Sequence, residues 1–136
     1  MLYLDTSVLV PLFQEDLHSP RTLAWMETVT AFVLSSWTVA EFSSALAVRS
    51  RMRQLSDPDR WHLETQLDQW LTARRVLNVL DQDVVEARQL VRRDIRLRAP
   101  DALHIAIARR GECELATLDQ DMAAAATRLG LPVITP

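Results

Sequence analysis

The chain has 136 residues, 49% of them hydrophobic and 24% charged, with a net charge of −3. This composition is typical of a globular protein with one domain, and no apolar run approaches the roughly 20 residues that a membrane-spanning helix needs. All 15 basic residues are arginine. The absence of lysine excludes P-loop nucleotide hydrolases, Schiff-base enzymes and phosphoacceptor receiver domains, and the negative net charge excludes a generally basic nucleic-acid binder.

The first residues carry no basic stretch before Asp5, so we expect no signal peptide. Cys113 is the only cysteine, which excludes an internal disulfide and a cysteine-rich zinc site. Both features favour a cytoplasmic protein.

Short apolar runs alternate with longer amphipathic stretches along the chain, which predicts alternating strands and helices. In chain order, we expect a strand over Leu2–Leu4, a helix capped by Thr6 or Ser7 and ending at Phe13, a helix over about 20–29, a strand over Phe32–Ser35, a helix from Thr38, a helix from Asp57, a strand over 76–80, a helix from Asp83, a helix over 99–108, a strand over 114–118, a helix over 120–129 and a strand over Val133–Ile134.

The strands are almost wholly apolar, which is typical of a parallel sheet covered on both faces. We therefore expect an α/β fold of three layers, with a central, mostly parallel sheet of about five strands flanked by helices. Sheets of this kind bind ligands at the carboxyl ends of their strands.

Four acidic residues fall where they could meet at that edge. Asp5 follows the first strand and Asp119 follows the fourth. Glu41 completes the capping-box pattern Thr38-Val39-Ala40-Glu41, in the predicted first turn of the helix after the second strand. Asp101 lies in the first turn of another helix. In a parallel sheet, all four side chains can project from one edge.

Carboxylates gathered in this way repel one another by about 4 kcal/mol for a pair some 4 Å apart at an effective dielectric constant near 20. Such a cluster needs a cation or a shared proton. Oxygen ligands without histidine or cysteine favour Mg²⁺ or Mn²⁺, which can activate water against a phosphodiester. Taken singly, however, Glu41, Asp101 and Asp119 are also explained by helix capping and the helix dipole.

Four segments resemble the motifs of the PIN-domain family, and specifically VapC-type toxins of prokaryotic toxin–antitoxin pairs. They are Leu4-Asp5-Thr6-Ser7-Val8-Leu9, Val39-Ala40-Glu41, Ala99-Pro100-Asp101-Ala102-Leu103-His104-Ile105-Ala106 and Ala116-Thr117-Leu118-Asp119. They occur in the family's order across essentially the whole chain, so we expect a single PIN-like domain over 1–136.

The resemblance implies a Mg²⁺- or Mn²⁺-dependent endoribonuclease whose catalytic and metal-binding acids are Asp5, Glu41, Asp101 and Asp119. Its hydroxyl positions fall on Thr6 or Ser7 and on Thr117, which would orient water or carboxylates. It also implies an RNA substrate, a homodimer, and a cognate antitoxin whose tail covers the acidic groove.

An arginine cluster and a histidine lie close to Asp101 in sequence. Contact with RNA phosphates and a solvated helix end explain the cluster equally well, and its members are Arg92, Arg93, Arg96 and Arg98. His104 follows Asp101 by three residues, so it could bind metal or act as a base, although a packed or hydrogen-bonded role is favoured.

Two other functions remain open at the level of sequence. An aspartyl-phosphate phosphatase would also place an aspartate after its first strand, but it favours a second acid where this chain has Ser7. The main alternative is a non-catalytic PIN-like module that binds RNA or a protein partner.

Overall fold

A computed structural model describes all 136 residues of the chain. Its centre is a five-stranded sheet in the order β3-β2-β1-β4-β5, in which every neighbouring pair is parallel. The strands are β1 (Leu2–Leu4), β2 (Phe32–Ser35), β3 (Val76–Leu77), β4 (Glu114–Ala116) and β5 (Val133–Ile134). The predicted α/β fold with a central parallel sheet of about five strands is confirmed.

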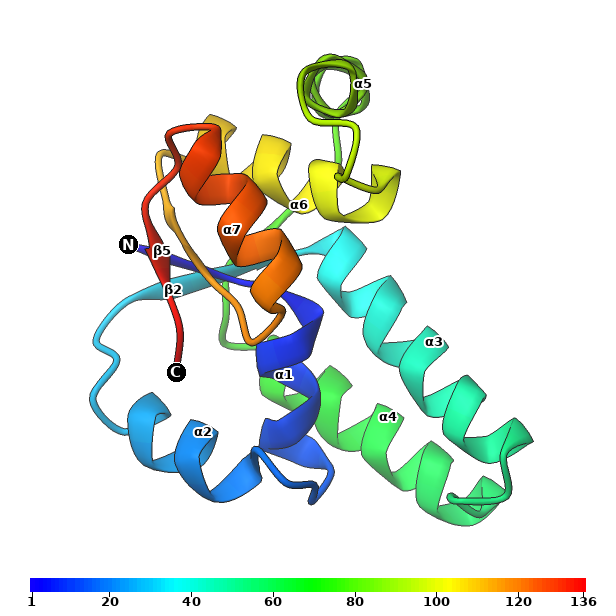
Figure 1. Ribbon diagram of the computed structural model, residues 1–136. Helices are drawn as coiled ribbons and strands as arrows, with labels where there is room; N and C mark the ends of the chain where they lie inside the picture. The colour runs from blue at the N-terminus through cyan, green and yellow to red at the C-terminus, as the bar shows by residue number, and fades with distance from the viewer.

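Seven helices cover the two faces of the sheet (Figure 1). One face carries α5 (Asp81–Arg93), α6 (Ala99–Arg110) and α7 (Gln120–Arg128). The other carries α1 (Thr6–Phe13), α2 (Ser19–Met26), α3 (Ser36–Arg51) and α4 (Asp57–Leu71). The predicted three-layer arrangement is therefore confirmed, and no helix is both long and apolar enough to cross a membrane.

The two faces of β1 belong to different hydrophobic clusters. Tyr3 lies in the cluster under α5, α6 and α7, whereas Leu4 lies in the cluster under α1, α3 and α4. This split follows from the alternation of side chains along a strand. It also places Tyr3 and Asp5, two residues apart, towards the same side of the sheet.

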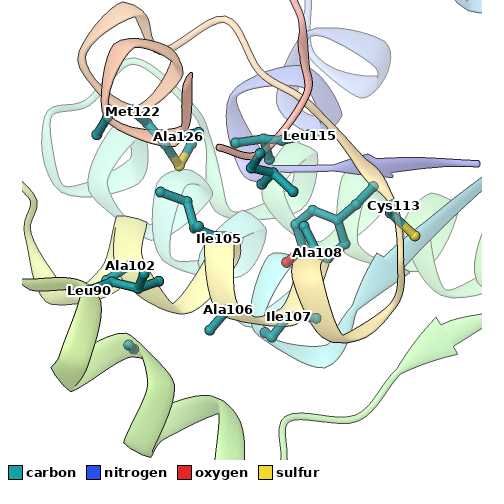
Figure 2. Packing of buried hydrophobic residues seen from close by; sticks show 14 of the residues in the cluster. Leu90, Ala102, Ile105, Ala106, Ile107, Ala108, Cys113, Leu115, Met122 and Ala126 are labelled. Atoms are coloured by element: carbon teal, nitrogen blue, oxygen red, sulfur yellow. The ribbon is translucent and has the colours of Figure 1, made fainter. Parts of the chain in front are cut away.

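Helix α6 is the most deeply enclosed helix of its layer (Figure 2). Ala106 points towards α5, where Leu90 lies, while Ile105 points towards Met122 and Ala126 of α7. Small side chains on the α5 side let the two helices approach closely. This packing fixes the position of α6, which carries Asp101 and His104.

Helices α1 and α3 begin earlier than the sequence predicts. The Asp5 side chain, and not Thr6 or Ser7, caps α1 by accepting a hydrogen bond from the backbone N–H of Val8. Ser35 caps α3 by accepting from the N–H of Thr38, so the helix begins at Ser36 and not after Thr38. The capping box assigned to Glu41 is therefore wrong, and Glu41 lies in the second turn of α3.

Two strands are shorter than predicted because their neighbours turn into helices. β3 ends at Leu77, opposite Ser35, where β2 ends and α3 begins. β4 ends at Ala116, opposite Leu4, because the next residue of β1 caps α1. Thr117 and Leu118 therefore leave the β1–β4 ladder at the edge where the acids lie.

The remaining predicted boundaries differ by a few residues. α2 ends at Met26 and not near Val29, since the Thr28 hydroxyl donates to the carbonyl of Trp25. α5 begins at Asp81, ahead of the predicted Asp83, because the Asp83 carboxylate accepts from the N–H of Leu80.

A buried ion pair joins α5 to the end of α6. Arg110 Nε lies 2.6 Å from Asp83 Oδ1, and a second guanidinium nitrogen lies 3.0 Å from Oδ2. Asp83 is buried, whereas Arg110 is partly exposed and also donates to the carbonyl of Asn78. Without Arg110 the Asp83 carboxylate would lack its counter-ion.

We expect Arg110→Ala to lower the free energy of unfolding by about 3 kcal/mol, because it leaves a buried carboxylate without a counter-ion. Urea denaturation at neutral pH measures the change. The control is Arg60→Ala, whose acidic partner Asp57 is exposed and stays hydrated when the pair is lost, so it should cost less than about 1 kcal/mol. Equal losses for the two variants would contradict a stabilising role for the Asp83–Arg110 pair.

Candidate active site

Asp5 is the most buried of the four predicted acids, with 2% of its surface exposed. Its backbone N–H still bonds to Ala116 of β4, and its carboxylate accepts from the N–H of Val8 at 3.1 Å. The residue therefore ends β1 and caps α1 at once. This double role fixes its carboxylate at the carboxyl edge of the central strand.

Two hydroxyl groups complete the surroundings of the Asp5 carboxylate. Ser7 Oγ lies 2.8 and 3.0 Å from the two carboxylate oxygens, and Thr117 Oγ1 donates to Oδ2 at 2.7 Å. Ser7 accepts from the N–H of Leu118, and Thr117 accepts from the N–H of Asp119. The hydroxyls thus connect Asp5 to the segment that carries Asp119.

Glu41 is held by donors from two other elements. Thr6 Oγ1 donates to Glu41 Oε2 at 2.6 Å, and His104 Nε2 lies 2.6 Å from the same oxygen. Thr6 and Ser7 therefore divide the role that the sequence assigned to either of them: Thr6 contacts Glu41 and Ser7 contacts Asp5.

His104 is hydrogen-bonded at both ring nitrogens, as favoured from the sequence. Its Nδ1 lies 2.7 Å from the hydroxyl of Tyr3, which in turn lies 2.7 Å from Ser35 Oγ. The sequence analysis did not single out Tyr3. The available signal was its position two residues before Asp5 on the same side of β1, as the only phenol of the chain.

Asp101 and Asp119 both lie close to the guanidinium group of Arg98. Arg98 Nε lies 3.1 Å from Asp101 Oδ2, and a terminal nitrogen of the same guanidinium lies 4.0 Å from Asp119 Oδ2. Asp101 is the third residue of α6, and Asp119 caps α7 by accepting from Met122, as the sequence predicts. The two carboxylates thus bracket Arg98, whose side chain is 72% exposed.

The carboxylates differ in the direction in which the protein shifts their pKa. Burial raises the pKa of Asp5, and its hydrogen bonds and the nearby His104 only partly offset this. Burial also raises the pKa of Asp101 despite Arg98, and the charge of Asp119 adds to the increase. Burial acts on Glu41 too, but hydrogen bonds from His104 and Thr6 outweigh it and lower its pKa.

The chemistry of these acids suits a hard cation, since every donor is an oxygen. Their placement is less complete, because no group of three or more His, Cys, Asp or Glu side chains lies close enough to hold a metal ion. Arg98 supplies positive charge to Asp101 and Asp119, and His104 donates to Glu41. The donor set fits Mg²⁺ or Mn²⁺ in kind, and closer coordination would require these side chains to move.

The four arginines singled out from the sequence do not share one environment. Arg92 and Arg93 lie in the last turn of α5, where they complement the helix dipole. Arg96 pairs with Asp94, which also pairs with Arg128. Only Arg98 contacts the predicted acids.

An apolar groove of about 460 Å³ opens beside the acids, between α5, α6 and the start of α3. Ala99, Pro100 and Leu103, which flank Asp101 in α6, line one side. Trp37 and Val84 lie among the residues of the other sides, and Arg88 and Arg92 also line the groove.

The chain matches the PIN domain family over residues 2–128, and it belongs to that family. No curated protein sequence is a significant match.

Several solved structures share the fold. FitAcB from Neisseria gonorrhoeae is 23% identical with a TM-score of 0.77, covering 98% of this chain and 96% of its own. VapC20 from Mycobacterium tuberculosis, a sarcin–ricin loop cleaving toxin, is 20% identical with a TM-score of 0.77 over the whole of both chains. VapBC2 from Rickettsia felis, solved with a DNA fragment from its promoter, is 15% identical with a TM-score of 0.71, covering 100% of this chain and 99% of its own.

The raised pKa of Asp5 makes its charge unfavourable for folding. In the folded chain the Asp5 carboxyl group stays protonated at pH values where the same group of the unfolded chain, with an ordinary pKa of 3.8, is ionised. The protonated Asp5 side chain therefore contributes its full share of stability below the pKa of the unfolded chain. That share is lost as the pH rises through the higher pKa of the folded chain. With EDTA present, we therefore expect Asp5→Asn to be more stable than wild type at pH 7, and the difference to shrink as the pH falls towards 3.8.

Urea denaturation of both proteins across this pH range measures the difference. Ser7 and Val8 can still donate to the amide oxygen of the asparagine, so the helix cap is retained. A pH-independent difference, or a variant less stable than wild type at pH 7, would show that burial of this charge is fully compensated.

Proposed function

We propose that this chain is a Mg²⁺- or Mn²⁺-dependent endoribonuclease and the toxin component of a toxin–antitoxin pair. One observation carries the proposal: a PIN-family chain buries the carboxylate of Asp5 at the carboxyl edge of its central strand. Burial opposes the charge of this carboxylate more than its hydrogen bonds and the nearby His104 favour it, which is costly for stability and is typical of functional sites.

The positions of the other acids support a common site. β1 lies between β2 and β4, so the chain order reverses on either side of it, and ligands bind at such a switch point in open parallel sheets. Glu41 follows β2 and Asp119 follows β4. Figure 1 shows the starts of α1, α3 and α7 near one another at this edge.

Asp5, Glu41, Asp101 and Asp119 are the residues that would hold the metal. When bound, Mg²⁺ or Mn²⁺ would supply an activated water and neutralise charge on the phosphodiester. The protein's part is to fix the carboxylates: Ser7 and Thr117 orient Asp5, and Thr6 orients Glu41. Both oxygens of Asp5 accept hydrogen bonds, whereas Thr6 and His104 both contact Oε2 of Glu41 and leave its Oε1 without a protein donor.

We assign RNA as the substrate. The side chains that would contact its phosphate backbone are Arg92, Arg93, Arg96 and Arg98. Guanidinium groups suit phosphate because they donate in a planar fork. Arg98 is the strongest of the four assignments, because it is exposed and already lies between two acids.

The proposal includes two protein partners, a cognate antitoxin and a second copy of this chain. VapC20 is a toxin, and a similar chain from Klebsiella pneumoniae was solved in a toxin–antitoxin complex, which supports an antitoxin for a related chain. The apolar groove beside Asp101 offers surface for a bound segment, since its lining includes Trp37, Val84 and Leu103. A basic antitoxin side chain would complement the adjacent acids.

The alternative is a PIN-like module that binds RNA or a protein without cleaving it. One observation favours it, namely that the acids form no assembled group of three. The two functions differ in their dependence on metal, so they are separated by the following experiment.

We expect the purified, antitoxin-free chain to cleave structured RNA with Mn²⁺ or Mg²⁺ and to lose activity in EDTA. Asp5→Asn and Asp101→Asn should each lower the cleavage rate by at least about 100-fold. Loss of an outer-sphere partner of a metal costs up to about 100-fold, and loss of a ligand itself should cost no less. Gel analysis of end-labelled RNA measures the rate.

Asp121→Asn is the matched control, because Asp121 is a first-turn acid of α7, as Asp101 is of α6, but makes no hydrogen bond to the site. It should cleave at the wild-type rate. If the wild type binds these RNAs and cleaves none of them with either metal, the non-catalytic module is the correct function.

We expect Arg98→Ala to have opposite effects on metal and RNA. Without RNA, Mn²⁺ should bind up to about fivefold more tightly, since an exposed ion pair contributes no more than about 1 kcal/mol. The Michaelis constant for RNA should rise through loss of a phosphate contact. Titration calorimetry and cleavage kinetics measure the two effects, with Arg60→Ala as the control, and weaker Mn²⁺ binding by the variant would contradict competition between Arg98 and the metal.

A further inference from the structure

We propose that Tyr3 and His104 are positioning residues that hold the Glu41 carboxylate in place for metal binding through a buried, directional chain of hydrogen bonds. The inference rests on the proposed function and extends it to two residues that contact neither the metal nor RNA.

The chain of hydrogen bonds crosses from β1 to α3 by way of α6. Ser35 Oγ lies 2.7 Å from the Tyr3 hydroxyl, that hydroxyl lies 2.7 Å from His104 Nδ1, and His104 Nε2 lies 2.6 Å from Glu41 Oε2. Tyr3, Ser35 and His104 are buried, with 2% of the His104 surface exposed. Few waters can therefore replace these contacts.

The direction of each bond follows from which groups carry protons. A glutamate is ordinarily a carboxylate at neutral pH and can only accept, as Glu41 Oε2 does from Thr6. Nε2 of His104 must then carry the hydrogen. The Tyr3 phenol, which ordinarily carries its proton at neutral pH, lies 2.7 Å from Nδ1 and can donate to it.

This arrangement satisfies a neutral imidazole completely. The Ser35 hydroxyl can donate to the Tyr3 oxygen and accepts from the backbone N–H of Thr38. The Thr38 hydroxyl donates to the carbonyl of Leu4. Tyr3 therefore selects the His104 tautomer that donates to Glu41. Thr6 donates to the same Glu41 oxygen from α1, which leaves Oε1 without a protein donor.

The positions of the two residues on their elements explain what the chain of hydrogen bonds achieves. His104 lies one turn after Asp101 on α6, which is packed tightly between α5 and α7 (Figure 2). By bonding to Glu41, His104 ties α3 to the helix that carries Asp101. Outer-sphere partners of this kind commonly change metal affinity by 10- to 100-fold.

Tyr3→Phe tests the proposal most sharply, because it removes one hydroxyl and keeps the buried ring. We expect long-range ¹H–¹⁵N spectra of the metal-free wild type to show His104 as the Nε2–H tautomer alone, and those of Tyr3→Phe to show a mixture of tautomers. We expect Mn²⁺ to bind Tyr3→Phe about tenfold more weakly by calorimetry. RNA cleavage by the variant should recover when Mn²⁺ is raised to saturation.

Substitutions of His104 give a second test that does not depend on Tyr3. His104→Gln places an amide donor where Nε2–H was, whereas His104→Asn places its amide closer to the Nδ1 position. We expect the glutamine variant to keep more of the Mn²⁺ affinity than the asparagine variant. Loss of the His104 signal in these variants also separates its resonance from those of His18 and His62.

Ile107→Val is the control for general destabilisation, since it removes one methylene from the same helix and leaves the chain of hydrogen bonds intact. It should lower the thermal midpoint without changing Mn²⁺ affinity or the His104 tautomer. A wild type that binds Mn²⁺ and cleaves RNA, together with a Tyr3→Phe variant of unchanged Mn²⁺ affinity, would overturn the positioning role alone. A wild type that binds no Mn²⁺ would overturn the proposed function and the positioning role with it.

Discussion

The carboxylate of Asp5 is the constraint on which the arrangement of this protein depends. It ends the central strand, caps the helix that follows, and accepts hydrogen bonds from Ser7 and Thr117. Because Thr117 also accepts from the N–H of Asp119, the end of β4 is tied to the end of β1. Asparagine has the same shape and could accept from Ser7 and Val8 at lower electrostatic cost, so a carboxylate at this position points to chemistry.

The other acids are tolerated for reasons that differ from one to the next. Asp101 and Asp119 lie at helix starts, where unpaired backbone N–H groups and the helix dipole favour negative charge. Glu41 lies in the second turn of α3, beyond the range of the cap, and depends on donors from α1 and α6. Glu41 therefore has the least structural explanation and the most specific set of partners.

Sequence reasoning was sufficient for the parallel sheet, because short apolar runs alternating with longer amphipathic ones admit few other folds. It also located Asp5, Asp101 and Asp119 at the correct ends of their elements. It failed at the start of α3, where Thr38 and Ser35 are both good caps, and the serine is favoured because β2 ends opposite β3 at that residue. It could not find the link from Tyr3 to Glu41, because residues 3, 41 and 104 meet only through the register of β1 against β2 and the packing of α6.

Glu41 on the one hand, and Asp101 and Asp119 on the other, differ in how firmly their positive or hydrogen-bonding partners are held. Glu41 is held by His104 and Thr6, and the buried His104 cannot leave without breaking its hydrogen bonds to Tyr3 and Glu41. Asp101 and Asp119 are held by Arg98, an exposed side chain that loses little when it moves into water. A divalent cation approaching this edge would therefore displace Arg98 and keep His104 in place. The absence of an assembled metal site and the proposed metal dependence are consistent on these terms, because one half of the ligand set is fixed in advance and the other is covered by an arginine that can be exchanged.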